Sequence, residues 1–415
     1  MPWELSIHHL ALEDNGDSTL IVAKQTFGGG VIDAKSILID GGFQQDYKEN
    51  LKEFLDKYLP PGHSLDALVV THYDSDHTGG ITALLQDNLA KVKSGARLYD
   101  QGNPNIAVEA GSGGTNKRAR NPKVTFISTG DQGPYLSYKQ AIEKRSKPVN
   151  RVSEYVCSMN GGEVDFDPKL VQAGYDPPDY LIGKDILWEG NEPPIGAPTA
   201  EIVAANYYVK TGPQANQYQK GNSDNEYSDE AKNCRSLGIL VRFGNFKYFI
   251  GGDMETAQED LLANYLGQVD VIKASHHGSN KSTSTTFLER TQPRAAIISC
   301  GWGTKNKKPT HPPGVNTLER LINENPTPTF QNQPLIFFTN HPGEAFINLN
   351  FTPEQQARFR ISGAQNQYGD VSLYVGYAGS LENQANFQIE YFDRAEQAAE
   401  GTEGMDIQVT IPNRL

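Results

Sequence analysis

The residues best suited to chemistry lie in one short segment, HYDSDH, directly after an apolar stretch. Its four potential metal ligands are His72, Asp74, Asp76 and His77. Imidazoles and carboxylates crowded this closely repel one another, or lose solvation, unless a cation neutralises them. On an extended or turning backbone, side chains two residues apart project the same way and converge. The segment therefore predicts a metal site, with room for one or two ions.

Two later clusters contain the same types of ligand. Asp253 ends the sequence GGD, and His276 and His277 lie within SHHGS. Taken alone, an aspartate after a strand is usually a turn former or helix cap, and a histidine pair is usually polar filler. No histidine lies between His77 and His276, so one imidazole-rich segment is far from the other in sequence. The three clusters together favour a metal centre over these structural alternatives.

Apolar periodicity predicts that each cluster follows a strand. The strands in question are LDALVV (65–70), KYFIGGD (247–253) and VDVIKAS (269–275). Further strands are predicted at 5–12, 18–24, 36–42 and 237–243, and helices at 47–59 and 257–266. Gly79-Gly80 is interpreted as a turn into a helix. Between residues 101 and 235 the periodicity fades, apart from short strands such as EIVAANYYVK (201–210).

The composition sets broad limits on function and location. The chain has 415 residues, a formal net charge of -13 and three widely spaced cysteines. The negative charge argues against attraction of the whole chain to nucleic acid or anionic membrane. The cysteines predict no disulfide framework, which favours a reducing compartment and a cytoplasmic location. Neither a signal-peptide pattern nor an apolar run of about 18 residues is found, so no membrane association is expected.

The order of these motifs resembles a known family. HxDxDH, GGD and HHGS, each after an apolar strand, resemble the metallo-β-lactamase fold, in the branch that includes the hydrolase domain of the ComEC competence proteins. Asp17-Ser18-Thr19, Asp40-Gly41-Gly42 and the sequence NCRS (233–236) add to the likeness, which covers about residues 5–100 and 230–325. The resemblance implies an α/β fold, an αββα sandwich with a long insertion and extra C-terminal strands. We therefore expect a hydrolase domain over 1–325, with an insertion at about 101–230, and a β-rich extension over 326–415 packed on it.

The resemblance also implies which residues bind metal. By position, the first metal is held by His72 and Asp74, the second by Asp76, His77 and His276, and Asp253 bridges the two. The chain departs from the family's HxHxDH pattern at Asp74, and Asn233 stands near the place of a further family histidine. The first site is therefore rich in oxygen ligands, which favours manganese or weakly held zinc. We expect one or two ions of zinc or manganese, with the second site filling first.

A bound metal would provide the nucleophile. It lowers the pKa of a bound water, and the resulting hydroxide attacks an electrophilic centre without a serine or cysteine nucleophile. We expect Asp76 to orient this hydroxide, and His277 and His311 to donate hydrogen bonds or protons to the substrate or its leaving group. For His311, a loop histidine before two prolines, a purely structural role stays open.

The leading substrate class is a phosphodiester, because the branch resembled includes nucleases and phosphocholine esterases. We expect an anionic partner, either a small molecule such as a nucleotide or phosphocholine ester, or a nucleic acid. Between residues 116 and 151, nine basic residues against two acidic ones give a local charge of +7, which suits a polyanion but equally suits a solvated loop. Two alternatives stay open: hydrolysis of a carboxylic ester, lactone or thioester at the same site, and a non-catalytic binding module that retains the fold.

Overall fold

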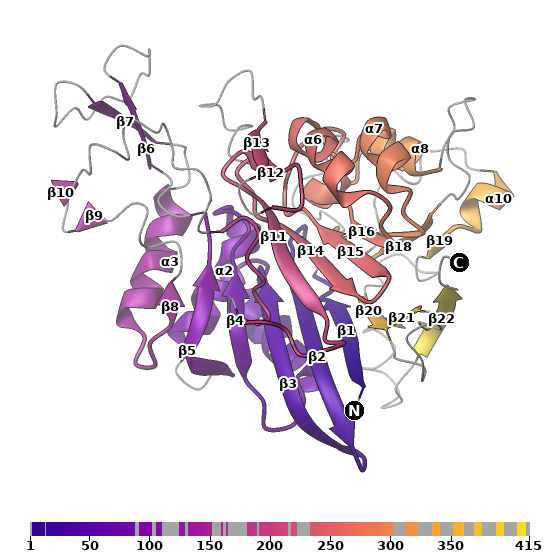
Figure 1. The fold of residues 1–415 in the computed structure, drawn as a ribbon, viewed down its shortest axis with the longest axis horizontal. Helices are drawn as coiled ribbons and strands as arrows, with labels where there is room; N and C mark the ends of the chain where they lie inside the picture. The colour runs from indigo at the N-terminus through magenta and orange to yellow at the C-terminus, as the bar shows by residue number, and fades with distance from the viewer. Residues whose placement is uncertain are drawn as a thin grey trace.

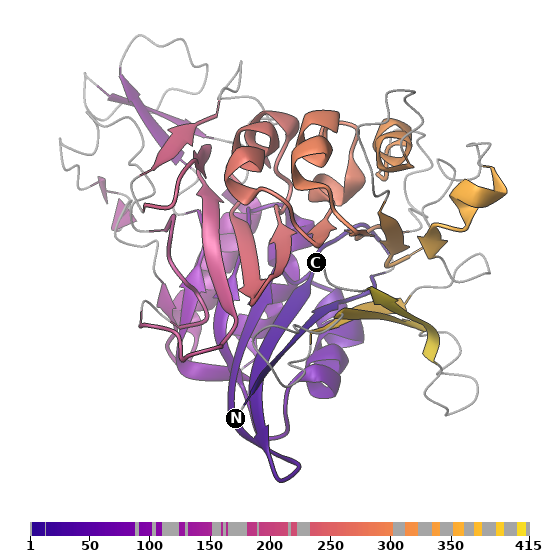
Figure 2. The same cartoon turned by 45° about the vertical axis from the view of Figure 1, so that its right-hand side comes forward.

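Two β-sheets of nine strands each dominate the part of the chain that the structure describes (Figure 1). The computed structural model describes residues 2–12, 14–87, 91–101, 105–109, 124–128, 132–151, 159–160, 163–164, 181–188, 191–214, 217–221, 233–301, 312–322, 334–340, 352–360, 369–375, 387–393 and 405–411. The two sheets stack face to face, and helices cover their outer faces (Figures 1 and 2). This is the αββα sandwich that the sequence motifs predict.

The first sheet is built mainly from the N-terminal part of the chain. In spatial order its strands are β22 (Met405–Ile411), β21 (Phe387–Asp393), β20 (Gly369–Val375), β1 (Trp3–His9), β2 (Thr19–Phe27), β3 (Gly30–Ile39), β4 (Leu65–Val69), β5 (Val92–Tyr99) and β8 (Asn150–Arg151). From β3 to β8 neighbouring strands run parallel, so the carboxyl ends of β3 and β4 lie at the same edge.

The second sheet is built from the later part of the chain. In spatial order its strands are β13 (Tyr218–Lys220), β12 (Tyr208–Lys210), β11 (Thr199–Ala205), β14 (Gly238–Phe243), β15 (Phe246–Ile250), β16 (Val271–Lys273), β17 (Ala295–Ile298), β18 (Leu335–Phe338) and β19 (Phe359–Arg360). Strands β15 to β19 run parallel, so the carboxyl ends of β15 and β16 also share an edge. The predicted single strand at 201–210 is wrong: it is two strands joined at Asn206 and Tyr207, which both have positive φ angles.

Alternating side chains explain why the layers stack. In β2, for example, Ile21 lies in the core between the sheets, whereas Leu20 and Val22 lie under the outer helices. The helices over the first sheet are η1 (Tyr47–Leu51), α1 (Lys52–Tyr58), α2 (Ser75–Gln86) and α3 (Gln132–Lys144). Those over the second are α6 (Thr256–Leu266), α7 (Thr285–Thr291) and α8 (Val315–Ile322). Each fully buried aliphatic side chain stabilises this arrangement by about 2 kcal/mol.

The C-terminal strands extend both sheets. β20 pairs with β1, and β18 pairs with β17, so residues beyond 326 continue the sandwich on either side. The division into a domain over 1–325 and an extension over 326–415 stays a prediction. The predicted insertion contains α3 and the short strands β6 (Asn105–Glu109), β7 (Val124–Ser128), β9 (Met159–Asn160) and β10 (Glu163–Val164). The described part of the chain also contains the short helices η3 (Ser275–Gly278) and α10 (Pro353–Gln356). Among the described residues, no helix is long and apolar enough to cross a membrane.

Candidate metal centre

The predicted ligands come together at one edge of the sandwich. His72 follows β4 and His77 lies in the first turn of α2, both on the first sheet. Asp253 follows β15, and His276 and His277 lie in η3 just after β16, on the second sheet. Because the strands carrying each group run parallel, their carboxyl ends meet at the seam between the sheets. The site is therefore assembled from residues about 200 positions apart in sequence.

The helix after the first motif begins earlier than predicted. α2 starts at Ser75, so Asp74 is its N-cap residue and Asp76 and His77 lie in its first turn. The prediction that Gly79 and Gly80 form a turn before this helix is wrong, because both lie inside it. A Cβ on Gly80 would collide with the carbonyl group of Gly41. The glycines therefore allow α2 to press against the loop after β3, and the helical turn directs Asp76 and His77 to the centre.

Asp40, the residue after β3, fixes the ring of His77. His77 Nδ1 lies 2.8 Å from Asp40 Oδ2, and Asp40 also accepts hydrogen bonds from the backbone N–H of Thr71 at 2.8 Å and its hydroxyl at 2.6 Å. Because the carboxylate accepts from Nδ1, the other ring nitrogen, Nε2, carries the lone pair. That nitrogen faces Asp253 Oδ1 at 3.2 Å. No role for Asp40 was predicted, although Asp40-Gly41-Gly42 belongs to the family likeness.

His277 is oriented in the same way from the second sheet. Its Nδ1 donates to the carbonyl oxygen of Ser299 at 3.1 Å, so Nε2 again carries the lone pair. Nε2 lies 3.3 Å from Asp76 Oδ2 and 3.6 Å from Asp253 Oδ1. The ring is only 3% exposed. His277 therefore lies among the ligands, whereas the sequence predicted a role toward the substrate.

Asp253 divides the histidines into two groups. Its Oδ1 faces His77 and His277, as described above. Its Oδ2 lies 3.7 Å from His72 Nε2 and 3.7 Å from His276 Nε2. Asp74 Oδ2 is 3.7 Å from His72 Nε2 and so joins the second of these groups. The structure thus places His276 beside His72 and His277 beside His77, whereas the sequence assignment grouped His276 with His77 and gave His277 no ligand role.

Asn233, the predicted amide ligand, lies beside His276. Asn233 is 6% exposed, and its Nδ2 lies 3.5 Å from the nearest ring nitrogens of His276. It therefore sits on the His72 side of Asp253, where the sequence suggested an amide ligand. His311 falls outside the described residues.

Several buried atoms at the centre fit a cation. Within the described residues, no hydrogen bond reaches Nε2 of His72, His77 or His277, Oδ1 of Asp253 or Oδ1 of Asn233. With Nδ1 of His77 and His277 protonated, the Nε2 atoms of these two rings are acceptors that face carboxylates, which is unfavourable unless a positive charge lies between them. Ligands in tetrahedral array around zinc are about 3.4 Å apart, close to the separations given above. Among the described residues, Asp17, His77, Asp253 and His277 form a group whose ligand atoms all lie within 4.8 Å of one another, so the donors on the Oδ1 side of Asp253 fit a divalent metal.

The electrostatics agree with this fit. Burial alone would lower the pKa of His77, yet the carboxylates of Asp253, Asp40 and Asp76 raise that pKa well above its usual value. Burial would raise the pKa of Asp253, but the imidazoles of His77, His277, His276 and His72 hold it well below its usual range. The group thus attracts positive charge, which a proton or a metal ion supplies.

A buried glutamate supports the loop that carries His276 and His277. Glu259 of α6 is fully buried and accepts a hydrogen bond from the backbone N–H of Thr283. Arg320 of α8 donates to the carbonyl groups of Asn280, Ser282 and Thr283 in the same loop. Two flanking helices therefore hold the loop in place.

We expect Glu259→Gln to stabilise the protein at alkaline pH. Burial raises the pKa of Glu259 from 4.5 to about 7, so the folded state keeps a proton that the unfolded state has released. Stability from this group is therefore present below pH 4.5 and is lost as pH rises through 7, by up to about 3 kcal/mol. In urea unfolding, the free energy of unfolding should fall less between pH 5 and pH 8 for the variant than for the wild-type protein. An equal decline in both proteins would contradict this.

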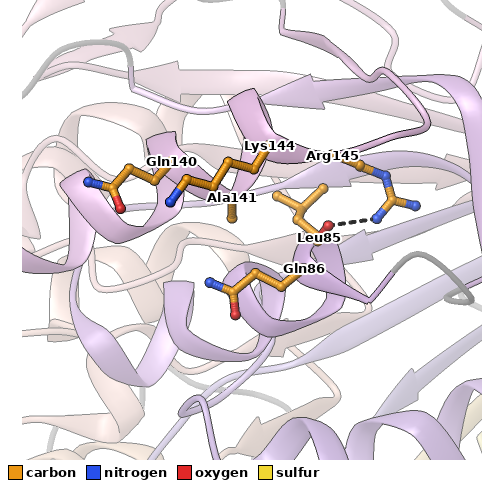
Figure 3. Close-up of a pocket in the computed structure, with 6 residues that line it drawn as sticks. All are labelled: Leu85, Gln86, Gln140, Ala141, Lys144 and Arg145. Carbon is orange, nitrogen blue, oxygen red and sulfur yellow. Dashed lines mark hydrogen bonds between the residues drawn. The ribbon is translucent and has the colours of Figure 1, made fainter.

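A pocket of about 280 Å³ lies elsewhere, between α2 and α3 (Figure 3). Leu85, Gln86, Gln140, Ala141, Lys144 and Arg145 line it, and none is a candidate ligand. Arg145 donates to the carbonyl oxygens of Leu84 at 3.3 Å and Leu85 at 2.9 Å, which caps the end of α2. Arg145, a basic residue of the predicted insertion, therefore has a structural role. The other basic residues predicted to form a patch lie partly outside the described residues.

The fold and the arrangement of candidate ligands resemble those of the metallo-β-lactamase superfamily, and the comparisons support this likeness. Residues 14–137 match the family model described as Metallo-beta-lactamase superfamily. Recombination protein 2 of Haemophilus influenzae is 39% identical over 92 residues, 22% of this chain and 11% of that protein. ComE operon protein 3 of Bacillus subtilis is 37% identical over 84 residues, 20% of this chain and 10% of that protein. The resemblance to this fold and to competence proteins is confirmed, and the match spans about a tenth of those relatives.

Solved structures of this fold are also similar, at low identity. The metallo-beta-lactamase fold protein YhfI from Bacillus subtilis is 10% identical, with a TM-score of 0.35, covering 87% of this chain and 97% of its own. Zinc-bound PqqB from Methylobacterium extorquens is 9% identical, with a TM-score of 0.31, covering 66% and 74%. At such scores these structures add nothing to the argument, and the fold assignment rests on the sheet topology and the family match.

Proposed function

We propose that the protein is a metal-dependent hydrolase that acts on phosphodiesters. One ion would be held by His72, Asp74, Asp253 and His276, with Asn233 nearby, and the other by Asp76, His77, Asp253 and His277. The observation that carries the proposal is the division of four histidine rings between the two oxygens of Asp253, with no hydrogen bond among the described residues to Nε2 of three of them. Manganese and zinc both suit this mixed set of nitrogen and oxygen ligands.

The charge of the site supports an anionic substrate. Two divalent cations held by these residues would supply positive charge beside the negatively charged phosphodiester group, which favours this substrate class. One curated relative is named for recombination, a process on nucleic acid, which supports nucleic acid among the substrates to be tested. A cytoplasmic location, expected from the cysteines, stays a prediction.

The protein's own residues would bind the metal and orient the attacking water. A divalent cation supplies Lewis-acid polarisation and makes water more acidic. Asp76 is the more exposed acid of its group, with a side chain 21% exposed, and it can accept a hydrogen bond from the attacking water. The rings of His77 and His277, which are fixed through their Nδ1 atoms, need no reorganisation during the reaction.

The test is hydrolysis by the purified protein with manganese or zinc. We expect cleavage of bis(p-nitrophenyl) phosphate, loss of activity with EDTA and recovery with metal. Asp76→Ala should lower kcat by at least about 100-fold, because it removes a metal ligand and an acceptor for the water proton. His63→Ala, which removes an imidazole outside the centre, is the control.

The rival functions are distinct outcomes of the same assay. Cleavage of lactones, thioesters or carboxylic esters without cleavage of phosphodiesters would show that the protein is a hydrolase of a different substrate class. Metal binding without any hydrolysis would favour a binding module. Absence of metal binding by the wild-type protein would contradict the proposal as a whole.

A further inference from the structure

A lysine is buried between the two sheets directly below the candidate metal centre. Lys273, the last residue of β16, is 1% exposed. It lies on the same face as Val271, in the core between the sheets, and pairs across the strands with Ile250 and Ile297 of that core. A buried ammonium group in such surroundings is costly unless an anion pairs with it. Its side chain forms an ion pair with Asp17 Oδ2.

Asp17 comes from the other sheet and lies behind the histidine rings. It precedes β2, and its Oδ1 lies 3.6 Å from His277 Nδ1, while its Oδ2 lies 3.9 Å from His77 Nδ1. Asp253 faces the opposite nitrogen, Nε2, of both rings. Asp17 belongs with His77, Asp253 and His277 to a group whose ligand atoms lie within 4.8 Å of one another, but its pairing with Lys273 and its position at the Nδ1 side of the rings favour a role beside the ligands over a role as one of them.

The backbone around Asp17 fixes its position. Its N–H donates to the carbonyl oxygen of Asp76 at 3.1 Å, and its own carbonyl accepts from the N–H of Gly42 at 2.8 Å. The residue is therefore tied both to the first turn of α2 and to the loop after β3. A negative charge held here favours protons on the Nδ1 atoms of both rings, and so lone pairs on their Nε2 atoms.

We propose that the Lys273–Asp17 ion pair is a positioning device that joins the two sheets and holds His77 and His277 with Nε2 toward the metal. The proposal rests on the metal centre of the proposed function. Lys273 supplies the positive charge that compensates the buried Asp17 carboxylate. Without Asp17, the same lysine becomes an unpaired cation beside a cation site.

The test is a double-mutant cycle of Asp17→Asn, Lys273→Met and the two combined, read out by manganese binding in electron paramagnetic resonance titrations. Asp17→Asn should weaken binding by up to about 100-fold, because the buried lysine then repels the metal. The double variant should recover only part of this loss, because it lacks the repulsion from Lys273 but also lacks the carboxylate that orients the two rings. A double variant that binds like wild type would show that the ring orientation does not need the pair and would overturn the proposal. A double variant that binds no better than Asp17→Asn, or an Asp17→Asn protein that binds like wild type, would overturn the proposal. So would the loss of one bound ion in Asp17→Asn, because Asp17 would then be a ligand.

The matched control is another buried lysine–carboxylate pair. Lys210 pairs with Glu201 and is 4% exposed, on β12, the second strand from one edge of the same sheet. Lys210→Met should lower the stability of the metal-free protein without changing metal affinity. If it weakens metal binding as much as Asp17→Asn does, the effect is general destabilisation and the proposal fails.

A second measurement covers the case in which Asp17→Asn does not fold. In Lys273→Met the unpaired Asp17 carboxylate lies beside the metal, so added manganese should raise the Tm of this variant more than that of wild type. An equal rise would overturn the proposal. If the wild-type protein binds metal but the variants do not show the expected differences in affinity and Tm, only the role of the ion pair is refuted. If the wild-type protein binds no metal, the proposed function itself is refuted.

Discussion

Asp253→Asn is expected to abolish hydrolysis, with kcat/KM falling by at least about 10³-fold, or about 4 kcal/mol of transition-state stabilisation. Asp253 is 3% exposed, and its two oxygens face the two groups of histidines. An asparagine keeps the shape but removes the charge and offers an amide N–H₂ in place of one oxygen, so both metal sites lose a ligand. Elemental analysis after dialysis should find little bound metal, and assays with bis(p-nitrophenyl) phosphate should find little activity.

A buried aspartate outside the centre provides the matched control for this variant. Asp270 is 6% exposed and accepts hydrogen bonds from the backbone N–H of Lys247 at 3.0 Å and from Arg294 at 3.3 Å. Asp270→Asn should cost stability but leave the metal content unchanged. If Asp253→Asn retains two ions and wild-type activity, Asp253 does not bridge them.

Much of the fold could be predicted from apolar periodicity. The strands at 65–70, 247–253 and 269–275 lie where the sequence indicated, because buried parallel strands form short apolar runs. The helix start at Ser75 was missed, since Gly79 and Gly80 are typical of turns. Their true role, close contact of α2 with the loop after β3, depends on a neighbour that local sequence does not reveal.

The sequence predicted which residues form the site better than it predicted how they are arranged. His72, Asp76, His77 and Asp253 stood out because metal-binding side chains clustered after strands. Asp40 and Asp17 lie in the family-like motifs but have roles that depend on contacts across the seam between the sheets. Lys273 looked like an ordinary strand residue, because its partner is 256 positions earlier in the sequence.

The neighbours His276 and His277 should have different effects when removed. Both have positive φ angles, 51° and 52°, and this left-handed turn directs the two rings to opposite oxygens of Asp253. His277 is 3% exposed and has its Nδ1 fixed by Ser299, whereas the side chain of His276 is 23% exposed. We therefore expect His277→Ala to remove the more tightly held ion and lower kcat/KM by about 10³-fold or more.

His276→Ala should retain about one ion per chain, because the group of Asp76, His77 and His277 stays complete. Metal analysis at increasing chelator concentration separates the two variants, and His63→Ala tests whether loss of any imidazole matters. The opposite order, with one ion kept by His277→Ala and none by His276→Ala, would restore the assignment read from the sequence. If both variants lose the same amount of bound metal, the two ions bind as a coupled pair through Asp253. Removal of either ion then leaves the Asp253 carboxylate poorly placed for the other ion.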